Sequence, residues 1–89
     1  MDRFEKGKVY FVKTGDGFYL VQQKSYRGWV AINFTHPNVN FNKLVIEKNG
    51  KDLFKYFETF DNVEYKSYSI NNIPEYRREM FTILKIGEF

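Results

Sequence analysis

The side chains that could perform acid–base chemistry are few and lie far apart in the sequence. His36 is the only histidine, and it precedes Pro37 in a segment that we expect to be a loop. A catalytic histidine needs a nucleophile and an orienting carboxylate that converge on it, and the sequence identifies neither. One histidine and no cysteine make a transition-metal site improbable, and the carboxylates lack the spacing of a calcium loop. We therefore predict no catalytic residues, no metal site and no cofactor in a protein that is not an enzyme.

Aromatic and basic residues form the stronger chemical pattern. Ten Phe, seven Tyr and one Trp make up 20% of the chain, which is more than a small core can hide. An AT-rich genome would favour Phe and Tyr codons, and the alternative is that some rings lie on a binding surface. Fourteen basic residues against eleven acidic ones give a formal net charge of +3. This excess is mild compared with the basic stripes of strong nucleic-acid binders.

Basic residues are interleaved with aromatic ones around two predicted turns. A protein that binds single strands stacks bases on aromatic rings while cations follow the phosphates. The alternative is a solvated lysine face that keeps a small aromatic protein soluble. The candidate residues for binding a nucleic acid or a protein partner are Tyr19, Lys24, Tyr26, Arg27, Trp29, Lys48 and Lys51.

The elements that must position these residues begin with three predicted strands. Residues 8–14, 18–24 and 29–35 are rich in β-branched and aromatic residues, and short Gly-containing turns separate them. Val30, Ile32 and Phe34 alternate with the other residues of the third segment, so we expect them to form a core face. The three strands should form an antiparallel meander.

In the second half of the chain, the sequence pattern favours one secondary structure less strongly. Residues 39–48 predict an extended segment, and residues 62–70 predict another strand. We favour a helix over a hairpin strand for residues 52–60, because Leu53, Phe54, Phe57 and Phe60 then form one stripe, with Asp52 as the cap. At the end of the chain two alternatives stay open. Either Pro74 begins a helix whose apolar face holds Ile73, Tyr76, Met80, Ile83 and Leu84, or residues 81–86 form a last strand.

The first hairpin is apolar on both faces. A turn at Gly15 and Asp16 places Val9, Phe11, Phe18 and Leu20 on one face, and Tyr10, Val12, Tyr19 and Val21 on the other. Both faces should therefore be covered, one inside a curled sheet or barrel and the other by a helix or a partner. The tyrosines and Trp29 suit a half-exposed position on the second face, since each has an apolar body and a polar tip.

The chain of 89 residues predicts one small domain of the α+β class. We expect it to be β-rich, with a small curled antiparallel sheet or an SH3-like barrel and one or two short helices. Residues 6–30 loosely resemble the opening meander of SH3-like barrels. They contain no motif that is specific enough to assign binding residues from this resemblance.

The expected location is the cytoplasm. The sequence has no cysteine, which suits a reducing compartment. No apolar run approaches the ~18 residues of a membrane span, and the first residues are charged where a signal peptide is apolar. We therefore expect no membrane partner.

Three interpretations of the function remain open. The first is a nucleic-acid-binding accessory protein that uses basic and aromatic residues on an antiparallel sheet. The second is a small regulator or inhibitor, of a kind typical of phages and mobile elements, that binds a larger host protein through exposed aromatic strands. It is favoured because Tyr, Trp and Arg dominate interface hot spots. The third is a self-assembling subunit joined through an exposed edge strand.

Overall fold

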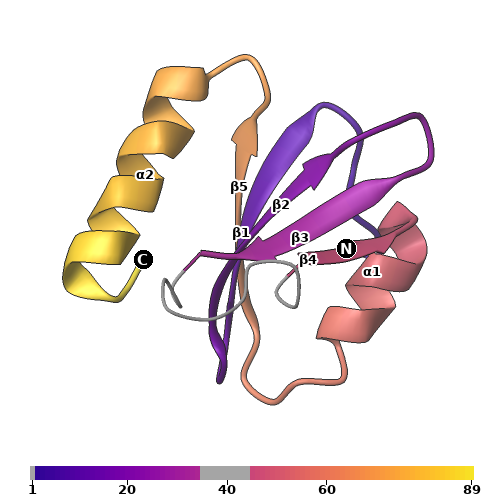
Figure 1. Cartoon of the computed structure of the whole chain (residues 1–89), viewed down its shortest axis with the longest axis horizontal. Helices are drawn as coiled ribbons and strands as arrows, with labels where there is room; N and C mark the ends of the chain where they lie inside the picture. The colour runs from indigo at the N-terminus through magenta and orange to yellow at the C-terminus, as the bar shows by residue number, and fades with distance from the viewer. Residues whose placement is uncertain (1, 35–44) are drawn as a thin grey trace.

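The computed structural model describes residues 2–34 and 45–89 of the chain. His36 and the first part of the expected extended segment, residues 39–44, lie outside these ranges. Within them, five strands and two helices form a β-rich α+β domain (Figure 1). The predicted fold class is confirmed.

Three consecutive strands form the predicted meander: β1 (Lys8–Thr14), β2 (Gly17–Gln23) and β3 (Trp29–Asn33). The first turn is tight because Thr14 pairs with Gly17, and Gly17 has a φ of 125°, which favours glycine. The Thr14 hydroxyl fixes this turn, because its Oγ1 accepts a hydrogen bond from the backbone N–H of Asp16 (3.0 Å). The register pairs Phe11 with Leu20 and Val12 with Tyr19, as the sequence predicted.

The sheet is open. Two more strands, β4 (Val45–Lys48) and β5 (Glu64–Ser69), extend it to the antiparallel order β4-β3-β2-β1-β5 (Figure 1). β4 pairs with β3 and β5 pairs with β1, so these two strands form the opposite edges of the sheet. Of the two architectures expected, the structure therefore shows the open sheet and not the closed barrel.

Helix α1 (Gly50–Phe57) begins directly after β4. Its N-cap is Asn49 and not Asp52 as predicted, because the Asn49 Oδ1 accepts the backbone N–H of Asp52 (2.8 Å). The Asn49 amide also donates to the Asp52 carboxylate (2.7 Å). The predicted helix is confirmed, but it starts earlier than expected and ends at Phe57 instead of residue 60.

A separate helix covers each face of the sheet, with α1 on one side and α2 (Ile73–Ile86) on the other (Figure 1). This answers why the hairpin is apolar on both faces. The core on the α2 side is built around three buried residues, Phe11, Phe18 and Ile83. The core on the α1 side is larger, and its buried residues are Phe4, Tyr10, Val12, Tyr19, Val21, Trp29, Ala31, Leu53, Phe54 and Phe57.

The last element is a helix, so a final strand over residues 81–86 is wrong. Pro74 lies in the first turn of α2, and Gly87 ends the helix with a φ of 73°. The expected apolar face is only partly buried. Ile83 is buried and Tyr76 and Met80 pack beside it, whereas Ile73 and Leu84 are exposed.

Strand β3 is enclosed more fully than the sequence suggested. Val30 is buried and Ile32 and Phe34 are half-buried on the α2 side, while Trp29 and Ala31 are buried on the α1 side. The prediction of a single core face was therefore too narrow. Neither helix of the described chain is long and apolar enough to cross a membrane.

Candidate functional site

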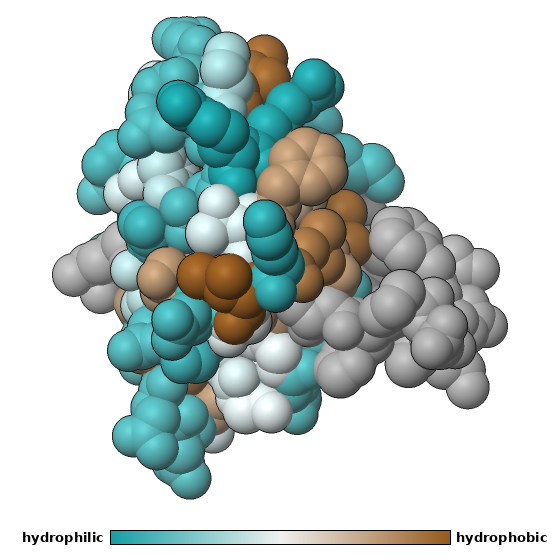
Figure 2. Space-filling model, turned by 90° about the vertical axis from the view of Figure 1, so that its left-hand side faces the viewer, coloured by the Kyte–Doolittle hydropathy of each residue, from teal (hydrophilic) through white to brown (hydrophobic). Residues whose placement is uncertain are grey.

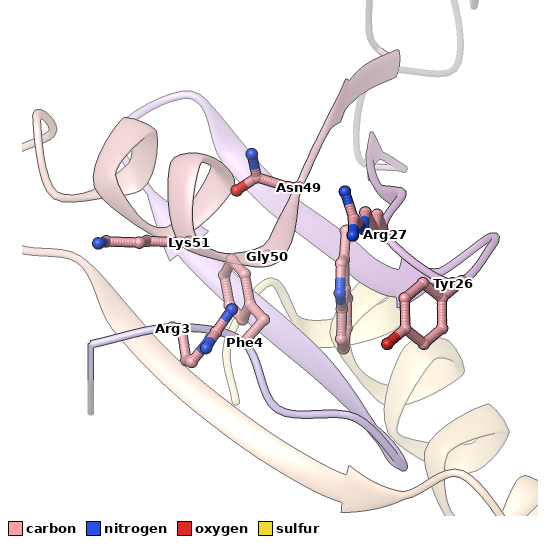
Figure 3. A pocket seen from close by; sticks show the side chains of 8 residues that line it. Arg3, Phe4, Tyr26, Arg27, Asn49, Gly50 and Lys51 are labelled. Atoms are coloured by element: carbon pink, nitrogen blue, oxygen red, sulfur yellow. The ribbon is translucent and has the colours of Figure 1, made fainter.

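A hollow of about 440 Å³ lies where three distant parts of the chain meet. They are the segment before β1, the turn between β2 and β3, and the start of α1 (Figure 3). We call it the cationic hollow, and its lining residues are Arg3, Phe4, Tyr26, Arg27, Trp29, Asn49, Gly50 and Lys51.

Phe4 anchors the N-terminal segment at this site. Its ring is buried and packs against rings of β1, β3, α1 and β5, with centroid distances of 4.8 Å to Tyr10 and 5.9 Å to Trp29. Its backbone N–H donates to the carbonyl of Gly50 (3.3 Å), which ties the segment to the first residue of α1. These contacts hold the neighbouring Arg3 at the rim of the hollow.

The turn between β2 and β3 is fixed by its own hydrogen bonds. The backbone N–H groups of Lys24 and Ser25 both donate to the carbonyl of Gly28 (2.8 and 3.1 Å), and the N–H of Gly28 donates to the Ser25 hydroxyl (3.1 Å). The Gln23 amide donates to the Tyr26 carbonyl (3.1 Å). This network presents Tyr26 and Arg27 at the tip of the turn, beside the hollow.

The start of α1 contributes backbone donors. Asn49 satisfies the N–H of Asp52, and the Asn49 carbonyl accepts the N–H of Leu53. Among the described residues, nothing accepts from the N–H groups of Gly50 and Lys51, the first two of the helix. Such groups at a helix N-terminus attract anions, and the helix dipole adds to the attraction.

Trp29 lies at the floor of the hollow, and the expectation that it is half-exposed was wrong. It is only 4% exposed, because Phe4 and α1 cover the ring. Its indole nitrogen lies 3.0 Å from where a Cβ would stand on Gly50. No acceptor for this N–H is found in the parts of the chain that the structure describes, yet none of their side-chain nitrogens is both fully buried and unpartnered. The N–H is therefore accessible, and because Trp29 lines the hollow it can donate to a ligand there.

Three cations surround this floor: Arg3, Arg27 and Lys51. Within residues 2–34 and 45–89, none of them forms an ion pair. Other basic residues are neutralised locally, as Lys13 is by Glu64 and Lys66 by Glu79. Figure 3 shows Arg27 and Lys51 on opposite sides of Gly50. The arrangement favours an anionic ligand.

Tyr26 is the most exposed large hydrophobic side chain of the described protein, at 80%. The ammonium of Lys6 and the guanidinium of Arg27 lie 5.7 and 5.9 Å from the centre of its ring. A second hollow of about 390 Å³ shares Arg3, Phe4, Tyr26 and Trp29 with the first and continues to Glu5, Lys6 and Gln23. Tyr26 thus borders two adjoining hollows.

The structure brings together four of the seven residues predicted for binding: Tyr26, Arg27, Trp29 and Lys51. Lys24 and Lys48 are exposed but do not line the hollow. Tyr19 was expected to be half-exposed, and this was wrong. It is buried under α1 against Phe57 (5.1 Å between ring centroids), and burial raises the pKa of its hydroxyl.

Sequence reasoning missed the other four lining residues: Arg3, Phe4, Asn49 and Gly50. A signal existed for Asn49, because an Asn followed three residues later by Asp is typical of a helix start. No local signal existed for Arg3 and Phe4, which precede the first strand and reach the hollow through tertiary packing.

Comparisons with protein-family models, with curated proteins and with solved structures find no match to this chain. The site is therefore interpreted from its own geometry. Across the described ranges, no group of three or more His, Cys, Asp or Glu could hold a metal ion.

Proposed function

We propose that this protein is a non-enzymatic module that binds nucleic acid, and that the cationic hollow holds phosphate. The observation that carries the proposal is the indole N–H of Trp29, which has no acceptor among the described residues and is set among Arg3, Arg27 and Lys51. The described residues that line the hollow include no carboxylate, histidine, serine or cysteine, which supports binding without a reaction. The lack of cysteine in the sequence suits an accessory protein of the cytoplasm.

The proposed binding surface lies at the end of the sheet and not on its faces. α1 and α2 cover the two faces, so the aromatic residues of the strands serve mainly as core. Tyr26 is the exception, because it extends from a turn and stays exposed beside the cations. Its ring can stack on a base of a single strand while Arg27 and Lys6 attract the flanking phosphates.

A salt titration with a short single-stranded oligonucleotide tests the proposal. If Arg3, Arg27 and Lys51 each contact a phosphate, the logarithm of affinity should fall with the logarithm of salt with a slope near about −2. Arg27→Ala and Lys51→Ala should each weaken binding and reduce the slope by about 0.7.

Lys55→Ala is the matched control, because Lys55 is exposed one turn further along α1 and does not line the hollow. It removes the same charge and should change binding much less than Lys51→Ala. Equal effects of the two substitutions would remove the hollow from the proposal. No binding to any single strand at low salt would reject the function itself.

A second candidate is a regulator or inhibitor that binds a larger protein, and the outer face of α2 favours it. Phe81 and Leu84 are 65% and 51% exposed, next to the exposed Arg77, Arg78 and Lys85. Figure 2 shows brown apolar surface interrupting the teal surface on this side. Such a surface suits an acidic protein with an apolar segment. Phe81→Ala should abolish recovery of a stoichiometric protein from nuclease-treated lysate without altering oligonucleotide binding.

A further inference from the structure

We propose that the cationic hollow recognises the end of a nucleic-acid strand through its terminal phosphate. The group recognised is a phosphomonoester, and the strand continues from the hollow past Tyr26. The inference rests on the proposed function, because it names which phosphate of the nucleic acid the site takes.

The donors at the floor match a terminal phosphate better than an internal one. Three N–H groups have no acceptor among the described residues: the indole N–H of Trp29 and the backbone N–H groups of Gly50 and Lys51. An internal phosphodiester offers two unbridged oxygens and one negative charge. A terminal phosphomonoester offers three such oxygens and about two negative charges at neutral pH. It can therefore satisfy all three donors at once.

The cationic hollow is more than a helix N-terminus, because the indole N–H of the buried Trp29 adds a side-chain donor to it. The Trp29 side chain is only 4% exposed, its N–H has no acceptor among the described residues, and the residue lines the hollow. An ionised phosphate oxygen would accept this N–H in a charge-assisted hydrogen bond, which is about twice as strong as a neutral one. The N–H thus points to a ligand oxygen at the floor.

The floor is closed, so the phosphate must enter from the solvent side. Phe4, Trp29 and Gly50 are all buried there. A Cβ on Gly50 would stand 3.0 Å from both the Phe4 carbonyl oxygen and the Trp29 indole nitrogen. A strand cannot pass between these groups, whereas a chain end can be inserted against them.

The exit for the strand is the adjoining hollow. It starts from the residues shared with the first hollow and runs to Glu5, Lys6 and Gln23. Tyr26 stands between the two with most of its ring exposed, where it can stack on the terminal base. Lys6 lies near that ring and can pair with the next phosphate along the strand. A phosphorylated peptide also ends in a phosphomonoester, but it would use neither the stacking ring nor a second phosphate site. These features favour nucleic acid.

The test compares four short single strands of one sequence: with a 5′-phosphate, with a 3′-phosphate, with both ends as hydroxyls, and with the phosphate at each end capped as a methyl ester. Fluorescence anisotropy measures the affinity of each. We expect one phosphorylated end to strengthen binding about tenfold or more, the effect of a single charge-assisted hydrogen bond. The methyl ester should lose most of this gain because it removes one oxygen and one charge.

Two variants test whether the preference for a phosphorylated end depends on the floor of the cationic hollow. Trp29→Phe keeps a ring but lacks the N–H, and it should reduce the preference for the phosphorylated end to within about threefold. If circular dichroism shows that this variant is poorly folded, the preference is compared between Lys51→Ala and Lys55→Ala instead. Only Lys51→Ala should reduce the preference.

The outcomes separate this inference from the proposed function. Equal affinity for all four strands would overturn end recognition while leaving nucleic-acid binding in place. Failure to bind any of them would overturn both. A phosphoserine peptide that binds as tightly as the phosphorylated strand, and competes with it, would overturn the assignment to nucleic acid.

Discussion

The indole of Trp29 packs so closely on the first residue of α1, Gly50, that a side chain at position 50 would meet it. Trp29 Nε1 would lie 3.0 Å from a Cβ placed on Gly50, which is so tight that the indole would have to shift by a few tenths of an ångström. The contact joins β3 to α1 and forms the floor of the cationic hollow. Gly50 thus permits this close approach through its lack of a side chain and not through its backbone conformation, since it is a helical residue without a positive φ.

Gly50→Ala should lower both stability and binding. The added methyl group must displace Trp29 or the Phe4 backbone, and such overpacking costs about 1–3 kcal/mol of the free energy of unfolding. Urea denaturation measures this change, and oligonucleotide affinity should fall with it. Gly15→Ala is the matched control, because a Cβ on Gly15 meets nothing within 4 Å. A Gly50→Ala protein as stable as the control would contradict the close contact.

Phe4→Ala should be strongly destabilising although Phe4 lies close to the chain terminus. The ring is buried among aromatic residues of both layers on the α1 side, and deleting a buried Phe costs about 3–5 kcal/mol. A chemical denaturation curve gives the free energy of unfolding. Phe81→Ala removes an equal ring that is mostly exposed and should cost far less. Similar losses in the two variants would show that the N-terminal segment is not part of the core.

Ile83→Ala and Leu84→Ala form a second matched pair, on neighbouring positions of α2. Ile83 is buried against the sheet at 1% exposure, and its truncation should cost about 2–5 kcal/mol. Leu84 faces outward, so its truncation should cost much less. Thermal unfolding of the two variants distinguishes them. The reverse order would mean that α2 packs on the sheet through a different face.

Stability should decline in alkaline solution because folded tyrosines retain their protons. Burial and the hydrogen bond that the Tyr65 hydroxyl donates to Glu58 (3.0 Å) raise the pKa of Tyr65 above its ordinary value of 10.0. The unfolded chain loses this proton near pH 10, whereas the folded protein keeps it. The stabilising contribution is therefore complete below pH 10 and is lost as the pH rises further. Burial raises the pKa of Tyr19 and Tyr68 in the same direction.

Denaturation curves between pH 7 and about pH 11 measure this decline. Tyr65→Phe should make it shallower, and at neutral pH it should cost about 0.5–1.5 kcal/mol for the lost hydrogen bond. Tyr26→Phe changes an exposed side chain and is the comparison variant. A free energy of unfolding that increases above pH 10 would be incompatible with this account.

The meander was predictable because its signals are local. Alternating apolar residues define the strands, and Gly17 supplies the backbone conformation that the first turn requires. The start of α1 was also encoded locally, in Asn49 and Asp52, although the pattern was attributed to the wrong cap. The sequence therefore predicted the fold class and most elements.

The candidate site was less predictable, because alternation tells which residues share a face and not what covers that face. Trp29 and Tyr19 were placed on the correct face, but the sequence does not show that α1 packs over it. Arg3 joins the hollow through the packing of Phe4, which links segments far apart in the chain. Tyr26 and Arg27 were identified because a turn tip is exposed whatever packs on the strands.

The order of strands has a consequence for how the chain folds. β1, β2 and β3 can assemble from contacts between sequence neighbours, whereas β5 must close a long loop to pair with β1, as Val12 does with Tyr65. Closing that loop costs chain entropy, so we expect the central hairpins to form first and the β5 edge to dock later. The hollow draws on the N-terminal segment, the turn after β2 and the start of α1, so it is completed only when α1 docks on the meander. A folding intermediate made of the three hairpin strands alone would therefore lack the proposed phosphate site, and we expect binding competence to appear late in folding.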